Sequence, residues 1–375
     1  MIRQVVLGVV VVLFGTTNGV CLADDITVLD PPQRLLVIVE EARAMAGNKP
    51  VESIPQGTIL TVTRANGNWR FTPDFKGWVH VKEAIPLDRA ITEMNAKLEV
   101  EENAAHYQLR GIALMILEEW EVAAQDFEMA YELGESSTNL HYNLGICYER
   151  MGEQAAALEE FDSILKAYPE EVPSLMARGN LLLQMKQIAA GLRDIDKAIE
   201  LKPNADDAHN SRGIALRMQG KYAEAIKAYD KALEINPQRA DSICNRGYAR
   251  KQLGDQAGAL KDYEAAYELA PASNSIRNDL AWLLVTSPDT AIRDPRRGVE
   301  LSEAVSKSTG NQDADFLDTL AAAYAANGRF PAAIETVKLA ISLIKQDADA
   351  SLMRERLKLY EAEKPFVDSI DSTPK

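Results

Sequence analysis

A glycine recurs every 34 residues along the middle of the chain. The five glycines are Gly111, Gly145, Gly179, Gly213 and Gly247. A fixed period of this length is typical of stacked-repeat proteins, in which one helical hairpin cannot bury its apolar face alone and its neighbours complete the core. The spacing therefore predicts a row of similar helical units.

The same register holds at other positions of the repeat. We count each unit from seven residues before its glycine, so that the glycine is position 8. Position 20 is small, and position 24 carries a ring or a branched side chain. The residues at position 20 are Ala123, Ala157, Gly191, Ala225 and Ala259, and those at position 24 are Phe127, Phe161, Ile195, Tyr229 and Tyr263. Small residues at positions 8 and 20 let two helices approach each other, and the side chain at position 24 fills the gap.

This pattern closely resembles the tetratricopeptide repeat (TPR) family. The resemblance implies an all-α TPR solenoid of helix-turn-helix repeats over residues 104–347, in which the first helix of each repeat lines a concave groove. The expected repeats are 104–137, 138–171, 172–205, 206–239, 240–273, 274–313 and 314–347.

The sixth of these repeats is six residues longer than the others. We expect a longer loop between its helices, because Asp294 can cap a helix and Pro295 suits a first helical turn. A charged amphipathic helix at 348–364 is expected to cap the stack, and 365–375 is expected to be a disordered tail.

Residues 1–23 show the three regions of a secretory signal peptide in order. Arg3 precedes about ten apolar residues, and small residues end the segment at Ala23. About 20 apolar residues are needed to span a bilayer, so cleavage is favoured over retention as an anchor. A lipid on Cys21 is a less favoured alternative. We expect a periplasmic or extracellular protein that begins at Asp24.

A small β domain is predicted between the signal and the repeats. After a linker at 24–31, residues 32–84 contain five short strand patterns, and Asn66-Gly67 is a strong hairpin signal. Five short strands in about 50 residues predict a small all-β barrel. Residues 85–103 are expected to form a linking helix.

Part of this region resembles the bacterial SH3-like (SH3b) family. The resemblance rests on the segment from Val62 to Trp69 and on Gly77-Trp78-Val79-His80. Family membership implies binding of peptides or of cell-wall material. Trp69 and Trp78 are interpreted as core residues in preference to a ligand platform.

Charge and motifs exclude several classes of function. A net charge of -15 argues against binding to nucleic acid or to an anionic membrane. The sequence contains no phosphate loop, nucleophile elbow, dinucleotide fingerprint or metal-binding histidine pair. We therefore expect no enzyme activity, no cofactor and no metal. Cys147 and Cys244 lie nearly three repeats apart, so no disulfide is expected between them.

The candidate ligand site is the stripe of the first helices that faces the groove. Positions 2, 5, 9 and 12 of a repeat share one helix face. The candidate residues, including two asparagines at position 6, are Asn143, Asn180, Asn210, Arg217, Asn245, Tyr248, Lys251, Asn278 and Trp282. Arg217 and Lys251 occupy the same position in successive repeats, so we expect an isolated basic pair beside Tyr248 and Trp282. This combination suits a peptide with an acidic or C-terminal group next to an apolar residue.

Two neighbouring patterns favour roles other than ligand binding. Asn143 and Asn245 match part of the carboxylate clamp of some TPR domains, but Asp207 stands where that clamp places a lysine. The arginines at position 7, among them Arg178 and Arg246, are expected to cover neighbouring helices with their stems.

These observations favour an exported, non-enzymatic scaffold that binds a peptide or protein in the TPR groove. Two alternatives stay open. In one, the β barrel binds cell-wall material and the solenoid is a spacer. In the other, the chain is an accessory subunit of a separate envelope enzyme. The groove residues can also be ordinary half-buried or solvated positions of a superhelix.

Overall fold

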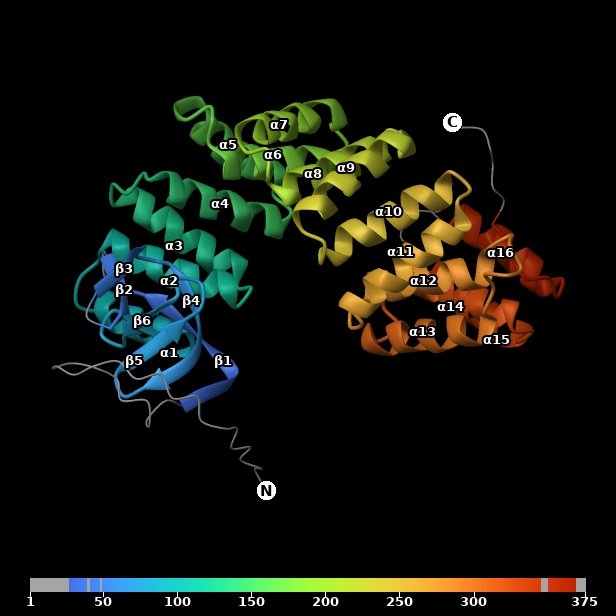
Figure 1. Cartoon of the computed structure of the whole chain (residues 1–375), viewed down its shortest axis with the longest axis horizontal. Helices are drawn as coiled ribbons and strands as arrows, with labels where there is room; N and C mark the ends of the chain where they lie inside the picture. Colours follow the sequence, from blue (N-terminus) through green and yellow to red (C-terminus); the bar gives the residue numbers. More distant parts are fainter. Residues whose placement is uncertain (1–26, 39–40, 48, 345–349, 369–375) are drawn as a thin grey trace, which may run out of the picture. The chain divides into compact units, whose positions relative to one another are not determined.

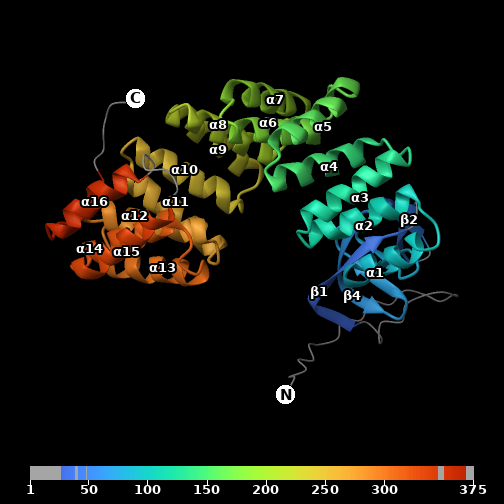
Figure 2. The same ribbon diagram turned by 180° about the vertical axis from the view of Figure 1, so that it is seen from behind.

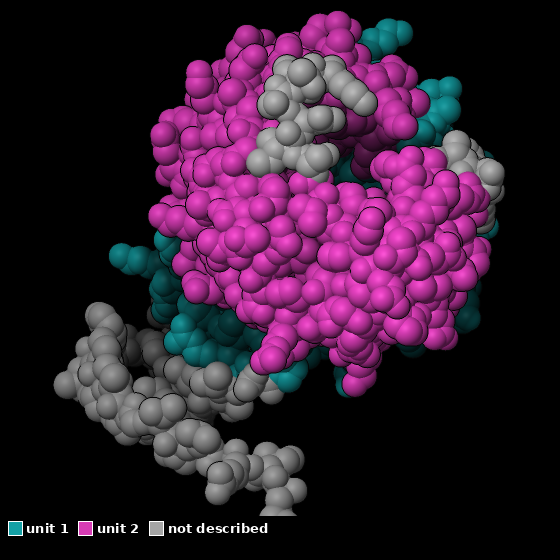
Figure 3. Space-filling view, turned by 90° about the vertical axis from the view of Figure 1, so that its right-hand side faces the viewer, with its two compact units in different colours: residues 1–169 teal, residues 170–375 magenta. Residues whose placement is uncertain are grey.

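The computed structural model describes residues 27–38, 41–47, 49–344 and 350–368 (Figure 1). The expected signal peptide therefore lies outside the described residues. The chain divides into two compact units, residues 1–169 and residues 170–375, which Figure 3 shows in different colours. The first unit contains a sheet, a linking helix and two helical hairpins. The second unit contains the remaining helices.

The first unit begins with one antiparallel sheet of seven strands. The strands are β1 (Thr27–Val37), β2 (Glu41–Ala46), β3 (Lys49–Pro55), β4 (Ile59–Asn66), β5 (Trp69–Thr72), β6 (Gly77–His80) and β7 (Ala84–Pro86). Their order in the sheet is β3-β2-β6-β5-β4-β1-β7. The predicted hairpin is present, since Asn66 pairs with Trp69 across a turn in which Gly67 has a φ of 52°.

The sheet is not closed into the predicted barrel. In the part of the chain that the structure describes, β3 pairs only with β2 and β7 pairs only with β1, so both edges are open. The prediction of five strands was also too low. In β3 every residue other than Ile54 is exposed, so this strand lacks the apolar alternation by which a strand is recognised.

The linking helix joins the sheet to the first repeat through a shared core. The helices of the first unit are α1 (Leu87–Leu98), α2 (Ala104–Ile116), α3 (Trp120–Glu132), α4 (Thr138–Met151) and α5 (Gln154–Ala167). Leu36 and Ile85 of the sheet lie in one buried cluster with Met94 of α1 and Leu109 of α2. The sheet, the linking helix and the first repeat therefore share one buried cluster.

The second unit continues the helical hairpins. Its helices are α6 (Val172–Gln184), α7 (Ile188–Leu201), α8 (Asp206–Met218), α9 (Tyr222–Ile235), α10 (Ala240–Gln252), α11 (Gln256–Leu269), α12 (Asn274–Thr286), α13 (Pro295–Ser308), α14 (Ala314–Ala326), α15 (Phe330–Leu343) and α16 (Ser351–Glu361). The Asp294 carboxylate accepts a hydrogen bond from the backbone N–H of Arg297, and Pro295 opens α13, as predicted. Figures 1 and 2 show α16 beside α14 and α15, and its Met353 and Tyr360 are buried there.

The 34-residue period follows from the packing of glycine against the residue at position 24. A Cβ atom on Gly111 would lie 2.9 Å from the ring of Phe127, and one on Gly213 would lie 2.3 Å from the ring of Tyr229. In the third repeat the partner is Ile195, and the small residue at position 20 is Gly191. The predicted role of these positions is confirmed, because a side chain at position 8 would occupy the space of the ring.

Candidate functional site

The predicted basic pair meets around one tyrosine in the second unit. The Arg217 guanidinium carbon lies 5.1 Å from the centroid of the Tyr248 ring, and Lys251 Nζ lies 5.7 Å from the same centroid. Arg217 comes from the end of α8, and the other two residues lie on α10. Both cations therefore contact one aromatic ring, an arrangement that is favourable because the ring face carries partial negative charge.

Tyr248 and Lys251 line a pocket with residues of α12 and α14. The pocket has a volume of about 210 Å³ and also contains the predicted Asn278 and Trp282. Its other walls are Tyr263, Asp279, Asp315, Asp318 and Thr319. The basic pair is thus not isolated as expected, since carboxylates line the same pocket.

Asp279 is a carboxylate of this pocket whose pKa is shifted. Burial raises its pKa above the ordinary value, and the raise is opposed by a hydrogen bond from Cys244 and by the charges of Lys251 and Arg217. The Cys244 thiol donates to Asp279 Oδ2 over 3.3 Å, and burial raises the pKa of that thiol. The two cations therefore partly balance a carboxylate of the protein itself.

The C-terminal segment Pro365–Asp368 contacts two residues that line this pocket, Lys251 and Trp282. The sequence predicts this segment to be disordered, yet Asp368 Oδ2 lies 3.2 Å from Lys251 Nζ and accepts a hydrogen bond of 3.3 Å from the Trp282 indole N–H. The rings of Phe366 and Trp282 are 5.8 Å apart. Sequence reasoning missed these contacts because they join residues up to 117 positions apart.

Four of the predicted asparagines do not belong to this cluster. Asn245 donates to Asn210 Oδ1 over 3.4 Å, and the Ser242 hydroxyl donates to the same oxygen over 2.9 Å, so these side chains link α8 to α10. Asn143 lies on α4 of the first unit, and Asn180 lies on α6. Both are half-buried. The predicted residues that remain in the candidate site are Arg217 on α8, Tyr248 and Lys251 on α10, and Asn278 and Trp282 on α12. The C-terminal segment contacts Lys251 and Trp282 of this set.

Arginines at position 7 form ion pairs along the repeats. Three of them bind the aspartate at position 23 of their own repeat, at 2.6 to 2.7 Å. These pairs are Arg110–Asp126, Arg178–Asp194 and Arg246–Asp262. Two arginines also bind the aspartate at position 25 of the preceding repeat, in the pairs Arg212–Asp196 and Arg246–Asp230. The arginines do bind neighbouring helices as expected, and the aspartates are the partners that sequence reasoning missed.

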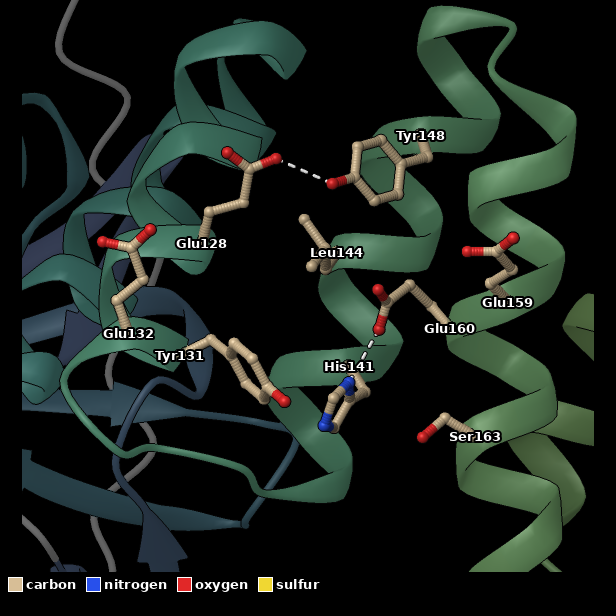
Figure 4. Close-up of a pocket in the computed structure, with 9 residues that line it drawn as sticks. All are labelled: Glu128, Tyr131, Glu132, His141, Leu144, Tyr148, Glu159, Glu160 and Ser163. Carbon is tan, nitrogen blue, oxygen red and sulfur yellow. Dashed lines mark hydrogen bonds and ion pairs between the residues drawn. The ribbon is translucent and has the colours of Figure 1, made fainter.

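The second repeat has no arginine in this series of ion pairs, which we call the ion-pair ladder, and it contains an acidic pocket. Its position 7 is Leu144, and a pocket of about 450 Å³ opens there between α3, α4 and α5 (Figure 4). Glu160 stands at position 23 and Glu128 at position 25 of the preceding repeat, the two positions whose aspartates bind the arginines elsewhere. Tyr148 donates to Glu128 over 2.7 Å, and His141 Nδ1 lies 2.7 Å from Glu160. Burial and the bond to Glu128 raise the pKa of Tyr148.

The outer face of the sheet carries the two tryptophans that were expected in the core. In β6 Val79 is buried, whereas Trp78 and His80 are half-buried on the opposite face because side chains alternate along a strand. The Trp69 ring meets His80 edge-on at 5.1 Å, and Phe71 meets Trp78 at 5.4 Å. The core interpretation of the tryptophans is therefore wrong.

The described ranges show no sign of two other classes of site, a metal site and a membrane-spanning helix. They contain no group of three or more side chains able to hold a metal ion. No helix among the same residues is long and apolar enough to span a membrane. Cys147 and Cys244 are free, as predicted; both are buried, and burial raises the pKa of Cys147 to about 12.

The described helices thus define a protein of repeated helical hairpins. Models of the tetratricopeptide repeat match residues 109–172, residues 206–239, and residues 172–205 and 240–273. Residues 109–273 are therefore tetratricopeptide repeats. The sixteen helices of the described ranges form a TPR solenoid preceded by an antiparallel sheet.

One solved structure supports this fold, and two others are similar to about half of the chain. A tetratricopeptide repeat protein from Parabacteroides merdae is 17% identical, with a TM-score of 0.52 over 73% of this chain and 99% of its own. The Thermus thermophilus TPR protein TTC0263 is 19% identical, with a TM-score of 0.43 over 48% of this chain and 98% of its own. YrrB, a TPR protein with an unusual peptide-binding site, is 23% identical, with a TM-score of 0.39 over 49% of this chain and 95% of its own. No curated protein matches this sequence.

Proposed function

We propose that this chain is an exported, non-enzymatic scaffold that binds a peptide or protein partner in the groove of α8, α10 and α12. The observation that carries the proposal is the cluster of Arg217 and Lys251 around Tyr248 in a strongly acidic chain, in which Lys251 and Tyr248 line a pocket. Cations beside an aromatic ring suit a partner that presents a carboxylate next to an apolar side chain. TPR solenoids use the concave side of such stacks for binding.

The test removes the cations and keeps their packing. Only 13% of the Lys251 side chain is exposed, so a glutamate there would place a second carboxylate near Asp279. Arg217→Met together with Lys251→Met keeps the apolar stems and removes both charges. We expect this double variant to lose partner capture from envelope extracts.

The matched control removes two lysines elsewhere. Lys227 on α9 and Lys261 on α11 are exposed and lie on second helices of the repeats. Lys227→Met with Lys261→Met should retain capture, because the same net charge is lost away from the groove. Equal capture by the two double variants would contradict the groove assignment.

Export is a separate part of the proposal. It rests on the order of basic, apolar and small residues in 1–23, and it has its own measurement. The intact mass of protein recovered from the envelope fraction is expected to correspond to a chain that begins at Asp24. A retained N-terminus, or a lipid on Cys21, would contradict soluble export.

The outer face of the sheet supports a second candidate, in which the β domain binds cell-wall material. The observation that favours it is the row of half-buried rings formed by Trp69, Phe71 and Trp78, with the Arg64 guanidinium 4.1 Å from the Phe71 ring. Sedimentation of the whole chain with purified cell wall distinguishes the candidates. Loss of binding in Trp78→Ala, with the Arg217 and Lys251 variant unaffected, would favour the sheet.

The accessory-subunit alternative concerns the identity of the partner. A captured enzyme whose activity changes when the chain is added would support it. The same variants of Arg217 and Lys251 apply, because an enzyme partner is also expected to use the groove.

A further inference from the structure

The C-terminal segment makes three contacts through Asp368. Its carboxylate meets Lys251 Nζ at 3.2 Å and the Trp282 indole N–H at 3.3 Å, and its backbone N–H donates to the Thr286 carbonyl over 2.7 Å. Thr286 is the last residue of α12, so its carbonyl has no partner within the helix. The Asp368 carboxylate therefore accepts from Lys251 and from Trp282. Its backbone N–H donates to the carbonyl of Thr286, which has no other partner in α12.

Phe366 occupies the apolar part of the same site. Its ring lies 5.8 Å from the Trp282 ring, and the Arg356 guanidinium carbon lies 5.4 Å from the centroids of both rings. Val367, between Phe366 and Asp368, is 38% exposed. Alternate residues thus face the groove, as expected for an extended peptide.

The protein side of this site is held in place by its own contacts. Arg356 on α16 donates through Nε to Asp318 on α14 over 2.9 Å, and 10% of its side chain is exposed. Lys251 and Trp282 stand on α10 and α12. Four helices therefore position the groups that surround Phe366 and Asp368.

We propose that Phe366–Asp368 is an intramolecular ligand of the groove, and that the partner peptide carries the same chemistry. That chemistry is an aromatic side chain two residues before a carboxylate. This inference rests on the proposed function, since it names the ligand class of the same site. It also implies that a partner must displace the segment before it binds.

The covalent link makes this competition effective. Only residues 362–365 separate the end of α16 from Phe366. Such a short connection gives an effective concentration on the order of millimolar, so even weak contacts keep the site occupied. If the segment occupies the site in nine of ten molecules, the affinity for an external peptide falls about tenfold.

The experiment uses the segment itself as the probe in trans. A fluorescein-labelled peptide with the sequence of residues 362–371 is titrated with the full chain and with a chain that ends at Lys364, and fluorescence anisotropy is measured. We expect saturable binding to the shortened chain that is at least about threefold tighter than binding to the full chain. Equal affinity for both chains, or no saturable binding to the shortened chain, would overturn the inference.

Variant peptides test which side chains are recognised. Phe366→Ala and Asp368→Ala peptides should each bind at least about tenfold more weakly, because each loses the groups that contact Trp282 and Lys251. The Val367→Ala and Glu363→Ala peptides are the matched controls, since both residues are exposed. Equal weakening by a control peptide would refute recognition of an aromatic residue and a carboxylate.

Two further measurements separate the remaining outcomes. The full chain with Asp368→Ala should bind the labelled peptide more tightly than the parent chain does, which covers the case in which truncation disturbs α16. A concentration-dependent dimer of the parent that dissociates in this variant would show that the segment binds a second copy, and would overturn the intramolecular assignment. If the peptide fails to bind while capture of a partner still depends on Arg217 and Lys251, only this inference fails and the proposed function stands.

Discussion

Gly213 has the least room of the five glycines at position 8. A Cβ atom there would lie 2.3 Å from Tyr229 Cε1 and 2.6 Å from Cδ1, whereas at Gly247 the nearest atoms, in Asp262 and Tyr263, would be 3.1 Å away. Tyr229 is fully buried among Leu216, Ala225, Ala228 and Ala249. The Tyr229 ring therefore cannot withdraw unless the backbone moves.

Two effects oppose each other when alanine replaces these glycines. Alanine favours the helix by about 1 kcal/mol relative to glycine. Overpacking of a close-packed core costs about 1–3 kcal/mol. At Gly247 a shift of a few tenths of an ångström relieves the contact, so the overpacking cost stays near the lower end of its range. That cost and the gain in helix propensity nearly cancel. We expect Gly213→Ala to lower the free energy of unfolding by about 1–2 kcal/mol and Gly247→Ala to change it by less than about 0.5 kcal/mol.

Urea unfolding followed by far-UV circular dichroism measures both changes. A double variant identifies the origin of the loss, because Tyr229→Leu removes the ring that the new methyl group meets. Tyr229→Leu should therefore cost at least about 0.5 kcal/mol less in the Gly213→Ala background than in the parent. The reasoning is refuted if Gly213→Ala is as stable as Gly247→Ala, or if the two substitutions are additive.

Three further predictions concern the ion-pair ladder, a buried carboxylate and the shared core. Leu144→Arg supplies the arginine that the second repeat lacks, so it should lower the free energy of unfolding by less than about 1 kcal/mol. Leu140→Arg places an unpaired charge in the core and should lower it by more than about 3 kcal/mol. Thermal unfolding measures both, and equal losses would contradict the ladder. Burial raises the pKa of Asp279, so the folded state binds its proton more tightly and stability falls as pH rises from 3.8 through the folded pKa. Asp279→Asn should consequently be more stable than the parent at pH 7, with a difference that shrinks toward pH 3.8 in urea unfolding; a constant difference would contradict this. Deletion of residues 1–86 removes the sheet side of the shared core, so amide hydrogen exchange in α1 and α2 should quicken while that in α10 does not, and unchanged exchange in α1 would refute the shared core.

The repeats could be predicted from the sequence because their defining contacts are local. A glycine and the ring that fills its space are 16 residues apart within one hairpin, as in Gly213 and Tyr229. Each hairpin packs its two helices through the same positions, so the same residue types recur at a fixed period. The cap at Asp294 is equally local, since its carboxylate bonds to an N–H three residues later.

The β domain was harder to predict because its pairing is not local. Thr27 at the start of β1 pairs with Ala65, and Leu36 pairs with both Ile59 and Ile85. An exposed edge strand such as β3 has no apolar alternation to mark it, and the alternation of β6 does not say which face meets the core. The barrel and the buried tryptophans were wrong for these reasons.

By itself, the sequence determined the helical hairpins and placed Arg217, Tyr248 and Lys251 on one stripe, because helix periodicity converts residue spacing into a shared face. Tertiary structure alone decided what surrounds that stripe. In the folded chain Asn210 and Asn245 are hydrogen-bonded to each other. Asp279 lies near Arg217 and Lys251, and Asp368 pairs with Lys251. The physical reason is distance along the chain, since Lys251 and Asp368 are 117 residues apart and only the packing of α10, α12, α14 and α16 brings them within reach.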